Sequence, residues 1–201
     1  MGLLAQMGRY EELRDQLEDV AEKSPEMVRG VIEWISYRSE YNDAENPLAV
    51  MEWADSQGLL EPEQRVRLAK LYLRLGMPDK AAVLMERGLY DRVIDPESEN
   101  WQLLAECWLG VPDPARAAEP LQNAAELSGD ADLFQRLGRL HLDLRRLKAA
   151  EAALRRALGG GAREARVWLF AALFMQARLD EARQVLIPPA HGTPRKPGTA
   201  R

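Results

Sequence analysis

A fixed internal spacing constrains this chain more than any other feature of its sequence. Four times, a leucine stands thirteen residues before an alanine, and apolar residues at helical spacing surround both positions. This pattern predicts two amphipathic helices joined by a short turn, with the alanine allowing the two backbones to approach closely. One such hairpin cannot bury both of its faces, so several copies must stack on one another. The pairs are Leu68 and Ala81, Leu104 and Ala117, Leu137 and Ala150, and Leu169 and Ala182.

The clearest copy spans residues 134–158. Small residues are expected where two helix backbones meet, and large side chains are expected to fill the space around that approach. The small positions are Gly138, Ala150 and Ala157, and the bulky ones are Phe134, Leu137, His141 and Leu154.

The N-terminal third keeps the same spacing less clearly. Trp34 and Pro47 stand thirteen residues apart, and Ser24-Pro25 and Asn46-Pro47 are typical of helix starts. Asp95-Pro96 is also expected to open a helix, and Asp130 to cap one. The residues at the turn inside each pair are spaced by 34, 34, 36, 33 and 32, and they are Gly8, Asn42, Gly76, Pro112, Arg145 and Ala177.

These residues resemble the signature of the tetratricopeptide repeat (TPR). The resemblance implies an all-α fold, a right-handed α-solenoid of antiparallel helix pairs, over residues 1–187 in about five and a half units. The first unit would be truncated, with only the last turn of its first helix present at residues 2–6. Residues 188–201, rich in proline and glycine, are expected to form a disordered basic tail. The pattern departs from the TPR signature at Pro47, Trp108, His141 and Phe170.

Charge and hydropathy exclude several classes of protein. The net charge is −5, with +3 in residues 188–201 and −8 in the rest, which argues against a nucleic-acid surface as the main function. No apolar run approaches the roughly 18 to 20 residues of a transmembrane helix. A single cysteine, Cys107, excludes an intramolecular disulfide.

No residue pattern predicts catalysis, a cofactor or a metal site. The triple glycine at 159–161 lacks the residues of a phosphate loop and is interpreted as a helix stop. His141 and Cys107 lie at packing positions of the repeat, and a core role is the default for all five tryptophans. We therefore expect a protein that is not an enzyme.

In TPR proteins the first helices line a groove that holds a peptide or a partner helix. Projected onto this chain, that rule predicts a largely basic strip that binds an acidic protein segment. The alternative is that its arginines are solvated or pair with Glu106 and Asp143. The predicted groove residues are Arg67, Lys70, Arg74, Gln102, Glu106, Arg136 and Arg139, with Phe174 as a further candidate.

Residues 68–128 are similar to bacterial TPR proteins of TonB–ExbB–ExbD systems. That resemblance implies a periplasmic or envelope-associated protein, whereas the general TPR resemblance would suit the cytoplasm. Two other functions stay open: an RNA-binding helical-repeat protein of the pentatricopeptide type, and an accessory domain of an enzyme that extends before Met1. The sequence does not identify the partner or the oligomeric state.

Overall fold

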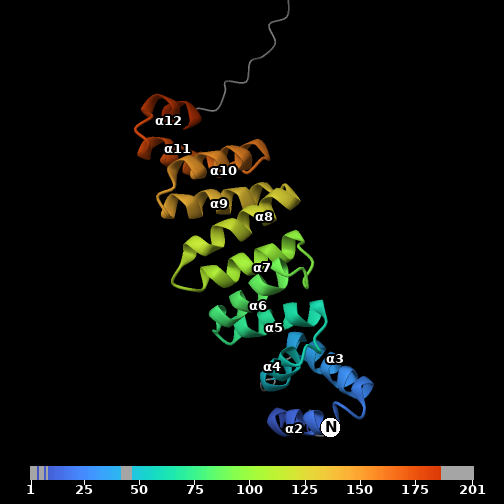
Figure 1. The fold of residues 1–201 in the computed structure, drawn as a ribbon. Coiled ribbons are helices and arrows are strands. Elements are labelled where there is room, and N and C mark those ends of the chain that lie inside the picture. Colours follow the sequence, from blue (N-terminus) through green and yellow to red (C-terminus); the bar gives the residue numbers. More distant parts are fainter. Residues whose placement is uncertain (1–3, 5–6, 8, 42–46, 187–201) are drawn as a thin grey trace, which may run out of the picture. The chain divides into compact units, whose positions relative to one another are not determined.

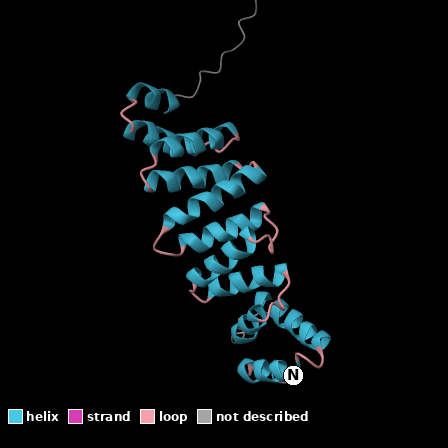
Figure 2. Cartoon of the chain, in the orientation of Figure 1, coloured by secondary structure: helices cyan, strands magenta, loops and turns pink. Residues whose placement is uncertain are grey.

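A computed structural model describes residues 4, 7, 9–41 and 47–186. These residues form helices and loops without a strand, which confirms the predicted all-α fold class (Figure 2). The chain divides into two compact units, here called unit 1 (Met1–Leu127) and unit 2 (Ser128–Arg201). Each unit is described by itself.

Unit 1 contains three helix pairs preceded by a single helix (Figure 1). In the pairs α3–α4 and α5–α6 the first helix packs against the second, and the second packs against the first helix of the next pair, as α6 does on α7; α7 itself packs against the 3₁₀ turn that precedes α8. The single helix α2 packs on α4 and stands where the second helix of the first repeat is expected. The helices are α2 (Tyr10–Val20), α3 (Pro25–Tyr41), α4 (Leu48–Ser56), α5 (Pro62–Arg74), α6 (Pro78–Tyr90), α7 (Ser98–Leu109), a 3₁₀ turn (Pro114–Ala117) and α8 (Ala118–Ser128).

Unit 2 contains two further pairs. Helix α10 packs on both α9 and α11, and the two first helices, α9 and α11, also touch each other. The helices are α9 (Ala131–Asp143), α10 (Leu147–Gly159), α11 (Ala165–Met175) and α12 (Leu179–Leu186).

The leucine–alanine spacing marks the closest contacts inside the pairs. All eight residues of the four predicted pairs are buried. At Gly138 of α9 an added Cβ would lie only 2.4 Å from the Cγ of Leu154 on α10. The predicted close approach of the two helices is therefore confirmed.

Turns form where the repeat predicts them. Gly76, Arg145 and Ala177, which end the first helices of three pairs, all have positive φ, at 72°, 57° and 60°. A left-handed residue at this position ends a helix and turns the chain back. The equivalent positions Gly8 and Asn42 lie outside the described residues, as do most of residues 2–6 and the whole of 188–201.

Two predicted helix starts are confirmed and one is wrong. Helix α3 begins at Pro25, and the Asp130 carboxylate accepts a hydrogen bond from the Asp132 backbone N–H at 2.8 Å. Asp95-Pro96 does not open a helix, because α7 begins at Ser98 with Glu97 in extended conformation before it. Asn46 lies outside the described residues.

The prediction that Trp34 packs in the core is also wrong. Its side chain is 37% exposed and lies under the guanidinium of Arg38, 4.9 Å from the ring centroid. The neighbouring Ile35 and Ser36 are buried instead. Helix α3 is long, at 17 residues, and its buried face follows a register that places Trp34 at the edge.

The glycines of α9 and α3 yield opposite predictions for the same substitution. Gly138→Ala should lower the free energy of unfolding by about 1–3 kcal/mol, because its methyl group would overlap the branch point of Leu154. Gly30→Ala should raise it by up to about 1 kcal/mol, because nothing lies within 4 Å and alanine favours helix. Urea unfolding of the two variants measures both effects. Equal effects of the two substitutions would contradict the close approach.

Candidate protein-binding surface

The predicted groove residues of unit 1 lie on two first helices. Arg67, Lys70 and Arg74 are spaced by three and four residues, so they share one face of α5. Gln102 and Glu106 are spaced by four residues on α7. The structure therefore groups each set on its own helix face, as the repeat predicts.

Two of the three predicted groove cations of α5 are anchored to α3. The Arg67 guanidinium donates to the Ser36 hydroxyl at 3.3 Å, and the Arg74 guanidinium donates to the Ser39 carbonyl. Both serines are buried. These contacts fix the two arginines against α3 within unit 1. The sequence signal for these two contacts was the pair Ser36 and Ser39, which are spaced by three residues within the apolar face of α3.

Helix α5 is flanked by two hollows. One, of about 410 Å³, lies towards α3, and the other, of about 390 Å³, lies towards α7. Glu63 and Arg67 border both, and Lys70 borders the second together with Asn100. The hollows have charged walls of both signs, which suits side chains of a polar peptide. Gln102 instead donates to the Ser98 hydroxyl at 3.3 Å.

In unit 2 the predicted cations lie beside an exposed apolar helix face. Arg136 is half-buried, and the Arg139 guanidinium lies over the Trp168 ring of α11, 4.6 Å from its centroid. On α11 the Phe174 side chain is 56% exposed and stacks on Phe170 with ring centroids 5.9 Å apart. This confirms that Phe174 is available on the surface. The role of Trp168 as a platform for Arg139 was not predicted.

The second helices use their charges to join neighbouring pairs. Three ion pairs connect neighbouring helix pairs at the same repeat position. One partner stands directly before the small residue of a pair, and the other stands five residues after the small position of the previous pair. The partner that stands before the small residue is a cation in unit 1 and an acid in unit 2. These ion pairs are Lys80–Glu52 at 2.8 Å, Arg116–Glu86 at 3.0 Å and Glu181–Arg155 at 3.7 Å.

Aromatic residues of the first helices complete two of these ion pairs. The Tyr72 hydroxyl donates to Glu52 at 2.8 Å, and Arg116 lies 3.4 Å from the centroid of the Trp108 ring. Burial and the hydrogen bond to Glu52 raise the pKa of the Tyr72 phenol well above its ordinary value. Tyr72 is therefore a structural hydrogen-bond donor.

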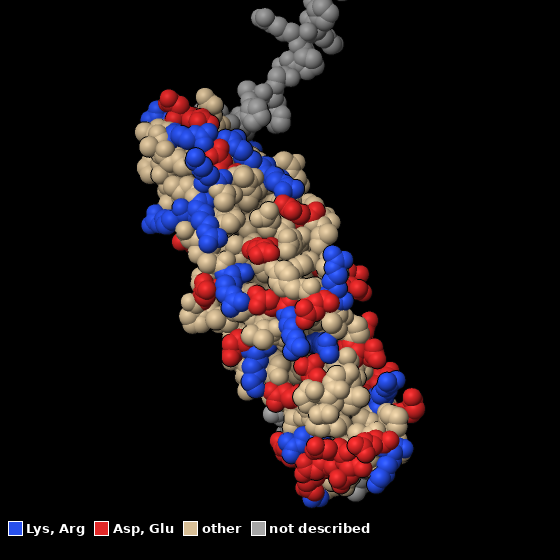
Figure 3. Space-filling model, in the orientation of Figure 1, with Lys and Arg blue, Asp and Glu red and all other residues tan. Residues whose placement is uncertain are grey.

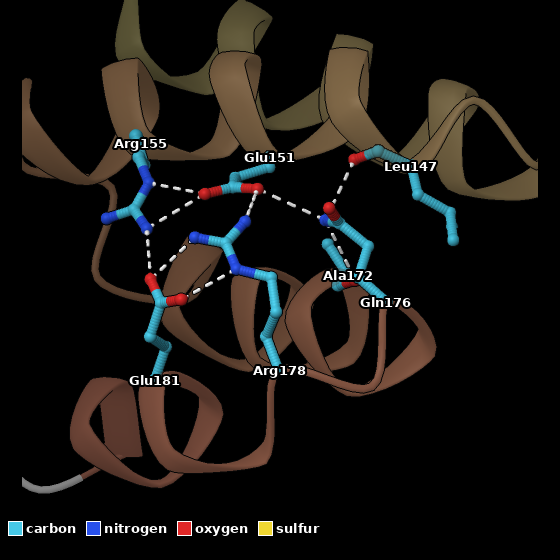
Figure 4. Close-up of polar contacts among 7 residues, drawn as sticks. All are labelled: Leu147, Glu151, Arg155, Ala172, Gln176, Arg178 and Glu181. Atoms are coloured by element: carbon cyan, nitrogen blue, oxygen red, sulfur yellow. Dashed lines mark hydrogen bonds and ion pairs between the residues drawn. The ribbon is translucent and has the colours of Figure 1, made fainter.

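Glu151 is the centre of the polar network in unit 2 (Figure 4). Its carboxylate accepts from Arg155 at 2.9 Å, from Gln176 at 3.1 Å and from Arg178 at 2.5 Å. Burial would raise the pKa of Glu151, but these hydrogen bonds outweigh it and hold the pKa below its ordinary value. Arg178 also bonds Glu181, so the network ties α10 to the turn between α11 and α12.

The reactive side chains of the sequence lie in the core. Cys107 is fully buried, and burial raises the pKa of its thiol to about 12. His141 is buried, and burial lowers the pKa of its imidazole. Both therefore occupy the packing positions predicted for them. Within the described residues no three metal-ligating side chains gather, and no helix is long and apolar enough to cross a membrane.

Comparisons with known proteins agree with the helical-repeat fold. A family model described as tetratricopeptide repeat matches residues 131–159, which comprise α9 and α10. A search of curated proteins gives no match.

Solved structures with similar folds include two proteins at low sequence identity. One is the MamA protein, with 18% identity, 78% of this chain and 87% of that chain covered, and a TM-score of 0.62. A MamA structure labelled AMB-1 covers 79% of this chain and 88% of its own, with 17% identity and a TM-score of 0.65. The other is YrrB, described as a TPR protein with an unusual peptide-binding site, with 16% identity, coverage of 84% and 87%, and a TM-score of 0.64.

Burial of the Cys107 thiol predicts chemical inertness. In the folded chain, Cys107 should react with a disulfide reagent at least about a hundredfold more slowly than in guanidinium, because the thiol is inaccessible and its thiolate is disfavoured. Absorbance of the released thiolate measures the rate. A Gln57→Cys variant, exposed at the end of α4, should react at once in the folded state. Rapid native reaction of Cys107 would contradict its packing role.

The Glu151 network predicts a defined pH dependence of stability. Glu151→Gln should lower the free energy of unfolding by about 1–2 kcal/mol near neutral pH, because three charge-assisted hydrogen bonds are weakened. The folded pKa lies below the ordinary 4.5, so this stabilisation is present above pH 4.5 and lost as pH falls through the folded pKa.

Urea unfolding at neutral and acidic pH tests this prediction. The difference between the wild type and Glu151→Gln should narrow in acid. Glu164→Gln, which alters an exposed acid of the same unit, should change stability little at either pH. A deficit of Glu151→Gln that persists unchanged in acid would contradict the charged role of Glu151.

Proposed function

We propose that this chain is a non-catalytic protein-binding scaffold that holds a peptide or a partner helix on its first-helix faces. The observation that carries the proposal is a contrast between the two kinds of helix. The second helices use their charges in ion pairs such as Lys80–Glu52, whereas α5 is flanked by two hollows and α11 exposes apolar side chains. The first-helix faces thus offer a partner hollows with charged walls in unit 1 and exposed apolar side chains in unit 2.

The chemistry of these faces suits an acidic protein segment. Arg67, Arg74 and Arg139 are each held by a contact within their own unit, so less side-chain entropy is lost when they bind a carboxylate. Lys70 is exposed beside the hollow between α5 and α7. The described peptide-binding site of YrrB, a protein of similar fold, supports the same use of this fold.

Two finer parts of the proposal rest on the sequence. The resemblance of residues 68–128 to TPR proteins of TonB systems makes an envelope assembly a candidate setting. RNA binding is disfavoured in unit 1, where 25 acidic residues face 13 lysines and arginines. An accessory role in a larger enzyme is compatible with a binding scaffold.

Selection of random peptides displayed on phage against the full chain tests the proposal. We expect selected peptides to bind in fluorescence anisotropy, and Arg136→Glu with Arg139→Glu, or Lys70→Glu with Gln102→Glu, to weaken them by roughly tenfold or more. The control Lys148→Glu reverses one charge at an exposed position of the second helix α10 and should leave binding unchanged. Circular dichroism checks that each variant is folded.

Two results would contradict the proposed scaffold function. If no peptide is selected, or if both groove variants bind as the wild type does, the first-helix faces are not the binding surface.

A further inference from the structure

Helix α11 of unit 2 has an apolar outer face. Its eleven residues contain one arginine and no acid. Val167, Phe170 and Phe174 follow one another at spacings of three and four, so they lie along one face. Val167 is 60% exposed and Phe174 56% exposed, and Phe170 stacks on Phe174. An exposed apolar stripe of this kind marks an interaction surface.

Cations border this stripe on the neighbouring helix. Arg139 of α9 lies over the Trp168 ring, directly beside Val167 in the sequence of α11. A guanidinium stacked on an aromatic face keeps its in-plane N–H donors for a carboxylate. Arg136 lies one turn earlier on the same helix. The surface of α9 and α11 therefore combines an apolar stripe with a cationic edge.

Net charge distinguishes the two units. Residues 128–186 of unit 2 contain 11 lysines and arginines against 7 acids, whereas unit 1 contains 13 against 25. Figure 3 shows acidic side chains gathered over α2 of unit 1. The net charge therefore favours the approach of an acidic segment to unit 2 over its approach to unit 1. The chain's own C-terminal residues 188–201, with a charge of +3, have the wrong sign for this surface.

We propose that α9 and α11 of unit 2 bind an acidic amphipathic segment of a partner protein. Apolar side chains spaced by three or four residues on that segment contact Val167, Phe170 and Phe174, and its carboxylates accept hydrogen bonds from Arg136 and Arg139. This inference rests on the proposed scaffold function and assigns the binding to one unit and one partner chemistry.

A matched pair of substitutions tests the location. Val167 of α11 and Val83 of α6 are both 60% exposed, so Val167→Glu and Val83→Glu make the same change at equal exposure in the two units. The probes are the phage-selected peptides, bound to the full chain and followed by fluorescence anisotropy. We expect peptides rich in acids and large apolar residues, weakened roughly tenfold or more by Val167→Glu and by Arg139→Glu but not by Val83→Glu.

Salt and self-association provide independent readouts. Because the carboxylate contacts are exposed, affinity should fall as salt rises, and a peptide with every acid replaced by lysine should not bind. Sedimentation of the chain alone tests a second copy as the occupant. Self-association that Val167→Glu abolishes, and with which the peptides do not compete, would overturn the proposal.

The outcomes separate this inference from the scaffold function. If selected peptides bind but are insensitive to Val167→Glu and weakened by Lys70→Glu, the partner surface lies in unit 1 and this inference fails while the scaffold function stands. If selected peptides are basic, the inference fails in the same way. If no peptide binds, both fail.

Discussion

The rest of the structure depends on the close approach of the two helices within each pair. At Gly138 there is no room for even a methyl group beside Leu154, and the alanines that stand thirteen residues after the core leucines are fully buried. Protein interiors are packed as tightly as organic crystals, so this approach fixes how each helix is rotated. Rotation in turn decides which residues line the outer faces. The composition of each outer face is thus a consequence of where small side chains stand inside the pair.

Ion pairs also connect neighbouring helix pairs within each unit. The ion pairs lie at the same repeat position each time, one residue before the small position and five residues after the previous one. In unit 1 the cation precedes the small residue, as in Lys80–Glu52, and in unit 2 the acid does, as in Glu181–Arg155. Exposed pairs contribute little stability singly, but opposite signs in the two units disfavour wrong pairings between them. The charges of the second helices thereby serve assembly of the stack.

Much of the fold could be predicted because the same pattern of apolar and small residues occurs several times in the sequence. The spacing of thirteen residues located the core leucines and alanines, and the interval between turns located the left-handed residues Gly76, Arg145 and Ala177. Prediction was wrong where the N-terminal third departs from the repeat. There the buried stripe of α3 runs through Val28, Ile32 and Ile35, whereas the thirteen-residue spacing counted back from Pro47 pointed to Trp34, which lies outside this stripe.

The sequence by itself determined the helix pairs, their turns and the assignment of each residue to a first or second helix, because these follow from the spacing of apolar and small side chains along the chain. Only the tertiary structure decided what the groove residues touch. The contacts of Arg74 with α3 and of Arg139 with Trp168 join residues far apart in sequence, and no local pattern encodes such distances. The exposure of Phe174 was likewise decided by packing, since a helix as apolar as α11 could equally have been buried on all sides.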